Sequence, residues 1–438
     1  MRNNPQEIID NSPMGRLQFL VIALCVVLVA LDGFDVLAIS FAAPGITDEW
    51  GINRATLGIV LSMELAGMAL GSVLLGRMAD RFGRRPTILF CIILMAVGML
   101  LAARAGSVIS LSIIRFVTGL GIGGMLASVN AMAAEYANAK RRAACVSLMA
   151  AGYPLGVIVG GAIASVLLAT FDWRAVFEFG AVFTAAMIPL AWFFLPESVS
   201  WLLHRQPANA LARVNTTLQR MGHSAIEELP APPATPQRRG WLELFTPGLA
   251  STTVLLTFAY LAHIMTFYFI LKWIPKIVVD MGFSAAYAGS VLVWANVGGL
   301  AGCILLSALT QRFNVRLLVI AAMLGSTVLV NVFGLGQSDL TQLALVAACA
   351  GFFTNAAVVG LYAIFAQSFP TNVRASGTGF VIGIGRGGAV LGPIIAGFLF
   401  EAGEGLATVA FVMALGSLVA AAMLALLKFY SRAQVATR

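Results

Sequence analysis

Two carboxylates stand three residues apart inside a strongly apolar stretch near the start of the chain. Asp32 and Asp35 belong to the run 17–43, whose other side chains are almost all apolar. A helix of about 20 apolar residues spans a bilayer, and side chains three residues apart share one helical face. A charge at that depth costs ~3 kcal/mol or more. We therefore interpret the pair as a polar site for protons or substrate inside a membrane protein; the alternative is a soluble core helix broken at Asp32-Gly33.

The composition favours the membrane interpretation. Hydrophobic residues make up 60% of the 438-residue chain and charged residues 11%, whereas soluble proteins carry about 25% charged residues. The 44 glycines are expected where membrane helices approach closely. The net charge of +8 comes from basic residues in short loops, a pattern that controls membrane topology. Nucleic acid is therefore not an expected partner.

The cysteines and the N-terminus suggest no further chemistry. All five cysteines lie in apolar runs, without metal-ligand spacing or a disulfide framework. We interpret them as small buried side chains and expect no cofactor and no metal. Residues 1–16 carry both charge signs and no cleavage-site pattern, so the first apolar run is predicted to be a retained helix.

Twelve apolar runs divide the chain. Because backbone polar groups in lipid must be satisfied within the segment, runs of this length predict helices and not barrel strands. The predicted fold is all-α, with twelve transmembrane helices in two pseudo-symmetric six-helix bundles. The runs are 17–43, 55–76, 86–104, 107–134, 143–169, 175–195, 248–271, 284–308, 317–336, 340–366, 375–400 and 406–428.

The basic residues set the expected orientation. With both termini in the cytoplasm, 20 of the 27 Lys and Arg residues lie in inside segments. Arg115 and Arg386 lie inside helices. The positive-inside rule therefore predicts cytoplasmic termini. The outside segments hold only Arg54, Arg104, Arg174, Lys272 and Lys276.

A hydrophilic central stretch separates two halves that repeat. Its proline-rich end, 230–239, is expected to be extended. The loop 76–85 (GRMADRFGRR) matches 307–316 (SALTQRFNVR) position by position, without a gap. Such a duplication is typical of rocking transporters with a site at the midplane. The predicted parts are a tail 1–16, a bundle 17–203, a cytoplasmic loop 204–246, a bundle 247–430 and a tail 431–438.

The ends of the fourth and tenth helices repeat as well. Glu135 with Arg142 corresponds to Gln367 with Arg374, at almost the same separation along the chain as the two loops. We expect Glu135, Arg142 and Arg374 to act in gating.

The loop 76–85 resembles the loop between helices two and three of the major facilitator superfamily. Gly76 and Gly83 permit tight turns, and Asp80 can cap a helix or pair with a neighbouring arginine. The alternative is a generic basic loop. The residues of this loop with a predicted gating role are Gly76, Asp80, Arg81, Gly83, Arg84 and Arg85.

An arginine in the fourth helix needs an anion. Arg115 opens the glycine-rich stretch 115–124 (RFVTGLGIGG), and Asp32 or Asp35 is its natural partner. A buried carboxylate can exchange a proton when such a contact is made and broken. We take this as a coupling hypothesis; a static ion pair between two helices is the alternative.

Several motifs together resemble the aromatic acid:proton symporter family. They are Asp-Gly-Phe-Asp at 32–35, Glu-Tyr at 135–136, Pro-Glu-Ser at 196–198, and the series 369–379 (FPTNVRASGTG) followed by 383–388 (GIGRGG). The resemblance implies proton-coupled uptake of a monocyclic aromatic carboxylate across a bacterial inner membrane. It assigns coupling or transport roles to Asp32, Asp35, Arg115, Glu135, Arg374 and Arg386. Gln311 departs from the pattern because an acid is expected there, and Arg316 stands where members often have histidine.

Two further charged residues lie near mid-depth. Arg386 is about eleven residues, or ~17 Å, into the eleventh helix. Its guanidinium could bind a substrate carboxylate bidentately or form a structural pair. Glu64 is a third candidate proton carrier or a partner of Arg386, with a structural buried Glu as the alternative.

The remaining substrate contacts are predicted from residue type. Rings and polar groups that could contact an aromatic ligand stand in the second half, although ordinary packing explains each of them singly. These candidates are His263, Tyr260, Trp294, Asn296, Asn355 and Tyr362.

The expected partners are a small aromatic carboxylate, protons and the lipid bilayer. No phosphate-binding loop, nucleophile elbow or His-Glu-x-x-His motif is present in the sequence, so we do not expect an enzyme. A monomer is compatible with the sequence, and the oligomeric state stays open. Two rivals remain. One is an exporter of the same superfamily, suggested by residues 152–156 (GYPLG). The other is a membrane sensor of aromatic acids.

Overall fold

The computed structural model describes residues 4–230, 241–246, 249–370 and 373–427. Twelve helices of this part are long and apolar enough to cross a membrane, which confirms the predicted fold class. They are α2 (Arg16–Trp50), α3 (Arg54–Phe82), α4 (Arg84–Ala103), α5 (Val108–Tyr136), α6 (Arg142–Thr170), α7 (Arg174–Phe194), α10 (Ala250–Asp280), α11 (Ala285–Leu309), α12 (Val315–Gly334), α13 (Leu340–Ser368), the pair α14 (Arg374–Gly385) and α15 (Gly387–Glu401) that forms one span, and α16 (Leu406–Leu426).

Some predicted features lie outside the described residues. They include most of the proline-rich run 230–239 and the tail 431–438. The same holds for Thr371 and Asn372 of the second-half motif and for the basic residues Arg2, Arg238, Arg239, Lys428, Arg432 and Arg438.

Three helices run well beyond the apolar runs. α3 continues past 76 to Phe82, so most of the predicted loop 76–85 is helical and Gly76 makes no turn. α2 continues to Trp50 and α10 to Asp280, through a proline in each case. The run 248–271 ends before Lys272, but the helical backbone continues through charged residues. The prediction that Lys272 and Lys276 lie in an outside loop is therefore wrong, because both lie on α10 and are buried.

Short helices occupy the segments expected to be tails and loops. α1 (Pro5–Asn11) precedes α2, while α8 (Val199–Arg205), α9 (Ala210–Met221) and a 3₁₀ turn η1 (Trp241–Phe245) follow α7. α9 is amphipathic and buries Val214, Leu218 and Met221 on one face. The central stretch is therefore folded in part and not simply a hydrophilic loop.

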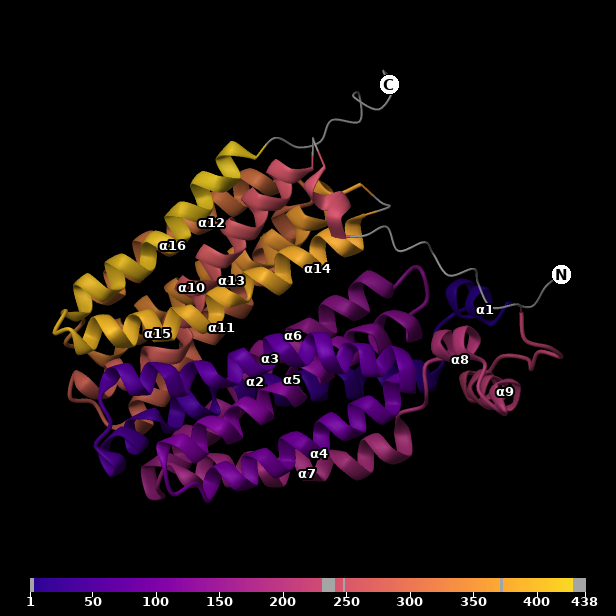
Figure 1. The fold of residues 1–438 in the computed structure, drawn as a ribbon, viewed down its shortest axis with the longest axis horizontal. Coiled ribbons are helices and arrows are strands. Elements are labelled where there is room, and N and C mark those ends of the chain that lie inside the picture. The colour runs from indigo at the N-terminus through magenta and orange to yellow at the C-terminus, as the bar shows by residue number, and fades with distance from the viewer. Residues whose placement is uncertain (1–3, 231–240, 247–248, 371–372, 428–438) are drawn as a thin grey trace. The chain divides into compact units, whose positions relative to one another are not determined.

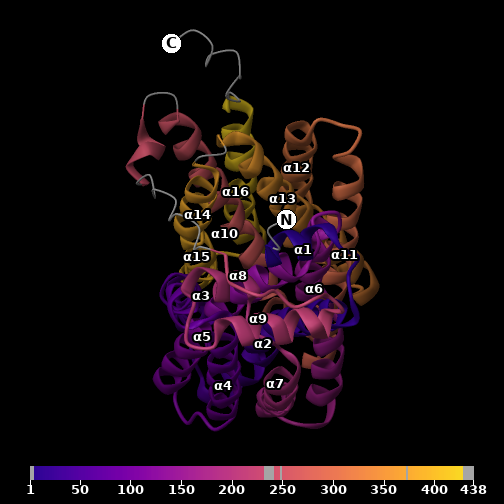
Figure 2. The same ribbon diagram turned by 90° about the vertical axis from the view of Figure 1, so that its right-hand side faces the viewer.

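The chain forms two compact units that divide three of the long helices. The first unit contains residues 1–38, 67–157 and 174–236, and the second contains 39–66, 158–173 and 237–438. In the first unit α4 packs against α5 and α7; in the second, α11 packs on α13, and α12 on both α13 and α16 (Figures 1 and 2). The bundle boundaries at 203 and 247 remain a prediction from the sequence.

Glycines bring α3 and α5 into backbone contact in the first unit. A Cβ on Gly67 would lie 2.1 Å from the carbonyl oxygen of Phe116, and one on Gly71 would lie 2.2 Å from that of Leu120. No real Cβ approaches so closely, so only glycine permits this helix spacing.

The same contact recurs between α11 and α13. A Cβ on Gly298 would lie 1.9 Å from the carbonyl oxygen of Ala348, and one on Gly302 would lie 2.2 Å from that of Phe352. Gly298 and Gly302 follow Gly67 and Gly71 at the same separation along the chain that relates the two repeated loops. The contacts therefore follow the duplication that the sequence predicts.

A second repeated contact joins the first helix of each half to the fifth. In both halves, two glycines four residues apart on the fifth helix meet two carbonyl oxygens four residues apart on the first. The pairs are Gly152 with Val26 and Gly156 with Ala30, then Gly388 with Leu261 and Gly392 with Met265. Each half thus builds this contact from the same arrangement of glycines and carbonyls.

Candidate functional site

The polar centre of the first unit is an ion pair between α2 and α5. Arg115 Nη1 donates to Asp35 Oδ1 at 2.9 Å, and Arg115 Nη2 donates to the backbone carbonyl of Asp35 at 2.8 Å. Arg115 is 0% exposed and Asp35 1%. Of the two partners that the sequence offered to Arg115, the structure places Asp35 in direct contact with it.

Soft apolar groups also lie beside this guanidinium. Arg115 Nη1 lies 3.3 Å from the sulfur of Met99, and the guanidinium carbon lies 5.4 Å from the centre of the Phe177 ring. Such a cation–π contact is worth about 2 kcal/mol when it is desolvated. The arginine is thus paired with the Asp35 carboxylate while its own side chain is fully buried.

Asp32 lies one helical turn before Asp35 and is equally buried, at 1% exposure. Between the two acids, a Cβ on Gly33 would lie 2.1 Å from the carbonyl oxygen of Tyr153 on α6. Glycine at this position lets α6 approach α2 beside the carboxylates. The Asp-Gly-Phe-Asp motif therefore combines two acids with a close helix contact.

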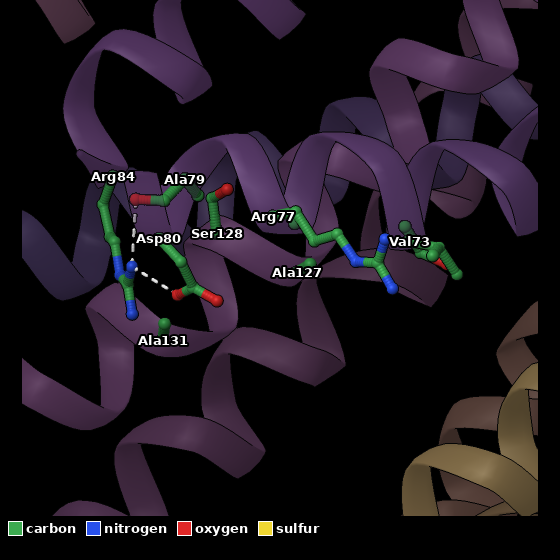
Figure 3. Close-up of a pocket in the computed structure, with 10 residues that line it drawn as sticks. Val73, Arg77, Ala79, Asp80, Arg84, Ala127, Ser128 and Ala131 are labelled. Atoms are coloured by element: carbon green, nitrogen blue, oxygen red, sulfur yellow. Dashed lines mark hydrogen bonds and ion pairs between the residues drawn. The ribbon is translucent and has the colours of Figure 1, made fainter. Parts of the chain in front are cut away.

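Residues 76–85, still called the loop 76–85 below, lie on the last turns of α3, at Gly83 and at the start of α4, and form a compact charged cluster. Arg84 Nη1 lies 2.8 Å from Asp80 Oδ1 and donates to the carbonyl of Ala79 at 3.0 Å (Figure 3). Asp80 thus pairs with an arginine, as one of its two predicted roles requires. Asp80, Arg84 and Gly76 line a cavity of about 330 Å³, which α5 also borders. The lining residues of α5 are Ala127, Ser128 and Ala131.

Glu197 caps α4 in place of Asp80. Its Oε1 accepts hydrogen bonds from the backbone N–H groups of Arg84 (2.8 Å), Arg85 (3.2 Å) and Ser198 (2.9 Å). Gly83 stands at φ +115°, and a Cβ there would lie 2.2 Å from Glu197 Oε2. A carboxylate at a helix N-terminus is favoured by the orphan N–H groups and the helix dipole.

The predicted gating residues Glu135 and Arg142 belong to separate contacts. Glu135 Oε1 lies 3.6 Å from Arg84 Nη2, and its Oε2 accepts a hydrogen bond from the Ser198 hydroxyl. Arg142 pairs with Asp10 of α1 and donates to the carbonyl of Ala134 at 3.0 Å.

Two arginines of the loop contact aromatic rings. Arg81 lies over Phe82 at 5.2 Å, and Arg85 lies over Trp192 at 5.6 Å. Reasoning from the sequence assigned no role to Asp10 and did not identify the hydrogen bonds of Glu197. The Pro-Glu-Ser motif was the available signal for Glu197.

The cluster is joined to the central stretch through α8. The carbonyl oxygen of Asp80 accepts hydrogen bonds from Trp201 Nε1 at 3.2 Å and Arg205 Nε at 3.1 Å. The Tyr136 hydroxyl donates to the carbonyl of Glu197 at 2.7 Å.

The corresponding loop of the second half is simpler. Gln311 and Arg312 are exposed, and Arg312 forms no ion pair within the described part of the chain. Arg374 donates from Nε to the carbonyl of Phe369 at 3.3 Å. Position 311 thus lacks the acid that the family pattern has there, and the neighbouring Arg312 has no carboxylate partner in the described part of the chain.

Arg386 stands at the break between α14 and α15 and is half-buried. A Cβ on the preceding Gly385 would lie 2.3 Å from the ring of Tyr260, whose hydroxyl is 3.1 Å from that of Tyr362. The Phe365 ring centre lies 5.6 Å from that of Tyr260. Of the predicted ring contacts, Tyr260 and Tyr362 are therefore brought together, beside the glycine that precedes Arg386.

His263 is held entirely by neighbours in the second unit. Its Nδ1 lies 2.9 Å from the Ser417 hydroxyl, its Nε2 lies 3.0 Å from the Thr354 carbonyl, and it is 0% exposed. Because the carbonyl oxygen can only accept, Nε2 carries the proton. This geometry favours the packed role that the sequence left open.

Of the other predicted substrate contacts, two are hydrogen-bonded within their own helices and one is exposed. Asn296 donates to the carbonyl of Leu292 at 2.9 Å and Asn355 to that of Gly351 at 3.0 Å, each within its own helix. Trp294 is 53% exposed. Trp294 thus points to the surface, whereas Asn296, on the same helix, is 1% exposed.

Glu64 pairs with a lysine that the sequence placed outside the membrane. Lys272 Nζ lies 3.5 Å from Glu64 Oε2, and both side chains are 0% exposed. Arg386 forms no ion pair in the part of the chain that the structure describes, so the predicted pairing of Glu64 with Arg386 is wrong. The reason is the length of α10, which carries Lys272 to the level of Glu64.

Comparisons with known proteins agree with this architecture. A model of the Major Facilitator Superfamily matches residues 25–330 and 256–437. The gallate transporter of Pseudomonas putida is 31% identical over 402 residues, which cover 91% of this chain and 89% of that protein. The 4-hydroxybenzoate transporter PcaK of Acinetobacter baylyi is 31% identical over 404 residues, or 90% of this chain and 87% of that protein.

Among solved structures, the inward open xylose transporter XylE from E. coli superposes with a TM-score of 0.71. The match covers 94% of this chain and 96% of that one at 17% identity. At that identity the likeness concerns the fold alone.

Proposed function

The chain belongs to the major facilitator superfamily and, within it, to the aromatic-acid transporters, and from this premise we propose that it imports a monocyclic aromatic carboxylate together with protons. It is a multi-pass membrane protein and a transporter, not an enzyme. We place it in the inner membrane with both termini in the cytoplasm, as the distribution of basic residues supports.

The observation that carries the proton coupling is the buried Asp35–Arg115 pair with Asp32 one turn away. Taking two charges out of water costs several kcal/mol per ion by order of magnitude. Ionisable groups at membrane depth mark proton and substrate pathways by default. A proton that arrives on Asp35 cancels the charge that holds Arg115, so the contact can open and close with protonation.

Asp32 extends this site by a second carboxyl on the same face of α2. We assign proton transfer to Asp32 and Asp35. Arg115 is the cation with which each carboxylate pairs in turn. Alternating access then follows from movement of the helices that these groups join.

The substrate side of the proposal rests on Arg386. Its guanidinium suits a carboxylate, and Tyr260 with Tyr362 supplies aromatic faces near the same helix break. A ring with an acid group would satisfy both features. The hydroxybenzoate and gallate named in the relatives' descriptions belong to this chemical class.

The test is uptake into proteoliposomes under an imposed inward proton gradient. The panel holds benzoate, mono- and dihydroxybenzoates, gallate, a phenylpropionate and a sugar. We expect one or more aromatic acids to accumulate and a protonophore to abolish the accumulation. Gradient-driven loss of a preloaded acid would overturn import in favour of the exporter.

A substitution at Asp32 tests the proton-coupling role separately. Asp32→Asn keeps the size and polarity of the side chain but cannot bind the proton. We expect it to lose proton-driven accumulation while it still exchanges labelled for unlabelled substrate across the membrane. Accumulation at the wild-type rate would show that Asp32 is not a coupling group.

A further inference from the structure

α3 begins at a charged cluster that joins it to two helices of the second half. The backbone N–H of Arg54 donates to Glu401 Oε2 at the end of α15 at 3.1 Å, and Arg54 Nη2 lies 3.1 Å from Asp280 Oδ2 at the end of α10. The guanidinium carbon also lies 5.4 Å from the centre of the Phe400 ring. Residues 54–66 of α3 belong to the second unit, together with α10 and α15. One residue of the first half is therefore held by an acid on each of two helices of the second half.

Next to this cluster, the backbones of α3 and α15 are in contact. A Cβ on Gly58 would lie 2.5 Å from the carbonyl oxygen of Pro393, and one on Gly397 would lie 2.6 Å from that of Arg54. One turn further along α3, the Ser62 hydroxyl donates to a carbonyl of α15 at 2.8 Å. Neither Gly58 nor Gly397 has a side chain that would have to unlock if the two helices separated.

The duplication repeats this glycine contact between the end of α6 and α11. Both segments, 158–173 and 285–309, also belong to the second unit. A Cβ on Gly289 would lie 2.4 Å from the hydroxyl oxygen of Ser165, and one on Gly161 would lie 2.8 Å from a methyl carbon of Val293. The corresponding glycines are Gly58 with Gly289 and Gly397 with Gly161, at the separations along the chain already found for the other glycine contacts.

The charges stand at one of these two contacts and not at the other. The positions that correspond to Arg54, Asp280 and Glu401 are Ala285, Gly45 and Ser165. The Ser165 hydroxyl donates to the carbonyl of Gly161 in its own helix at 2.8 Å. Uncharged residues therefore suffice for the glycine contact of α6 with α11, and helix packing does not explain the three charges at the start of α3.

We propose that Arg54, Asp280 and Glu401 form an outer latch, which holds α3 to α10 and α15 while the outside end of the transporter is closed and opens when substrate enters from outside. The proposal rests on the proposed function, in which both termini are cytoplasmic and the start of α3 is outside. Movement of one half against the other must separate α3 from α15. The latch therefore sets how often the outside end opens.

The exposure of these charges suits a contact that opens in every cycle. The side chains of Arg54 and Asp280 are 42% and 31% exposed, and Glu401 is exposed as well. Partly exposed ion pairs are weak, and water can solvate both charges once they separate. Asp280 also keeps Lys276, four residues earlier on α10, as a partner. Opening the latch therefore does not leave an unpaired charge in a buried place.

The labelling rate of a buried cysteine measures how often the outer end opens. A membrane-impermeant thiol reagent is added to right-side-out membrane vesicles. Ser62→Cys is the reporter, because Ser62 is 0% exposed and lies in the contact between α3 and α15. The protein without this substitution gives the background of the five native cysteines.

Two variants each remove one partner of Arg54. We expect Asp280→Asn and Glu401→Ala to raise the labelling rate of the reporter about two- to fivefold, the factor that a weak charged contact contributes. An unchanged rate in either variant would overturn the proposal.

Two further variants separate the latch from general loosening. Arg54→Gln with Asp280→Asn should raise the rate no more than Asp280→Asn alone, since both changes remove the same pair. Lys276→Gln is the matched control, because it removes the partner of Asp280 within α10 and leaves the link to α3. An increase in Lys276→Gln equal to that in Asp280→Asn would contradict a latch.

A second reporter distinguishes opening of the transporter from fraying of α3. Val293 corresponds to Ser62 in the repeat, is half-buried, and lies at the related contact of α11 with α6. Because movement of the two halves opens both contacts, Asp280→Asn should also raise the labelling rate of Val293→Cys. A rise confined to Ser62→Cys would show that only α3 moves and would overturn the proposal.

A cross-link tests whether the latch must open for transport. Arg54→Cys with Glu401→Cys, joined by a short reducible bifunctional thiol reagent, fixes α3 to α15. We expect uptake to be lost on joining and to return on reduction. Lys276→Cys with Asp280→Cys, joined in the same way within α10, is the control and should keep its uptake. Undiminished uptake after complete joining of positions 54 and 401 would overturn the proposal.

Labelling needs no substrate, so its result is independent of the compound that is transported. If the wild type accumulates an aromatic acid but the labelling rates do not respond, the latch alone fails. If the labelling rates respond as expected but the wild type accumulates no acid of the panel, the proposed function fails and the latch stands.

Discussion

The two halves of the molecule share their closest helix contacts and differ in their polar interiors. In the first half, Asp35 and Arg115 form a fully buried ion pair. The positions that correspond to them in the second half, judged from the repeated glycine contacts, are the buried apolar residues Ile270 and Ala347. The second half instead buries His263, which is hydrogen-bonded to a serine and a backbone carbonyl, and Lys272.

This difference separates what the fold needs from what the function needs. Glycines set the spacing of the helices in both halves, at the same places along the repeat. The Asp35–Arg115 pair occupies the interior of the first half, although apolar residues fill the two equivalent places in the second. The ion pair is therefore best explained by its chemistry and not by the stability of a six-helix bundle.

The largest expected effect comes from breaking the first-half pair. Arg115→Met removes the cation that pairs with the buried Asp35 carboxylate, which should cost about 3–5 kcal/mol of stability and abolish uptake. The double variant Asp35→Ile with Arg115→Met gives this half an apolar interior like the second. It should recover the melting temperature but not the uptake. Proton-driven uptake by the double variant would contradict the comparison.

A smaller effect is expected from filling the repeated glycine contacts. Gly71→Ala and Gly302→Ala each place a Cβ 2.2 Å from a carbonyl oxygen of the partner helix. Both should lower the stability by about 1–3 kcal/mol, as overpacking does, and to a similar extent. Gly387→Ala is the control because nothing lies within 4 Å of its Cβ. Thermal unfolding in detergent measures all three, and clearly unequal losses at positions 71 and 302 would break the symmetry argument.

The smallest effect concerns the two repeated loops. Arg84→Gln removes the ion pairs with Asp80 and Glu135. Partly exposed pairs are worth about 0.2–1 kcal/mol each, so initial uptake should fall a few-fold. Arg312→Gln, at the related loop of the second half, should change uptake little. Rates normalised to protein in the membrane test this, and equal losses would show that the second loop gates as strongly as the first.

Much of the fold could be predicted from the sequence, for physical reasons that particular residues illustrate. Apolar length alone located the twelve spans because lipid imposes it. The cost of a buried guanidinium required an acid for Arg115, and the structure supplies Asp35. The family resemblance, carried by spaced glycines and charges, is confirmed by the relatives.

Other features could not be derived in this way. A charged residue ends an apolar run but not a helix, so Lys272 was assigned to a loop instead of the interior. Which face of a helix meets its neighbours depends on tertiary packing, so Trp294 and Asn296 were grouped although they do not converge. The three backbone hydrogen bonds of Glu197 depend on how α8 returns to α4, and no local pattern encodes that.

The carboxylate of Glu197 has a mechanical consequence. It accepts hydrogen bonds from the backbone N–H of Arg84, which begins α4, and from that of Ser198, which precedes α8. Trp201 of α8 in turn donates a hydrogen bond to the carbonyl of Asp80. α8 is therefore hydrogen-bonded to the loop 76–85 as far as Arg205. A displacement of that loop therefore also displaces α8. The first unit continues through α9, where the carbonyl oxygen of Met221 would lie 2.3 Å from a Cβ on Gly15, so the connection between the halves begins beyond α9 and not at the end of α7. Insertion of residues into the connection beyond α9 should be tolerated. Insertion between residues 195 and 205 should displace α8 from the loop 76–85, so that movement of this loop no longer moves α8.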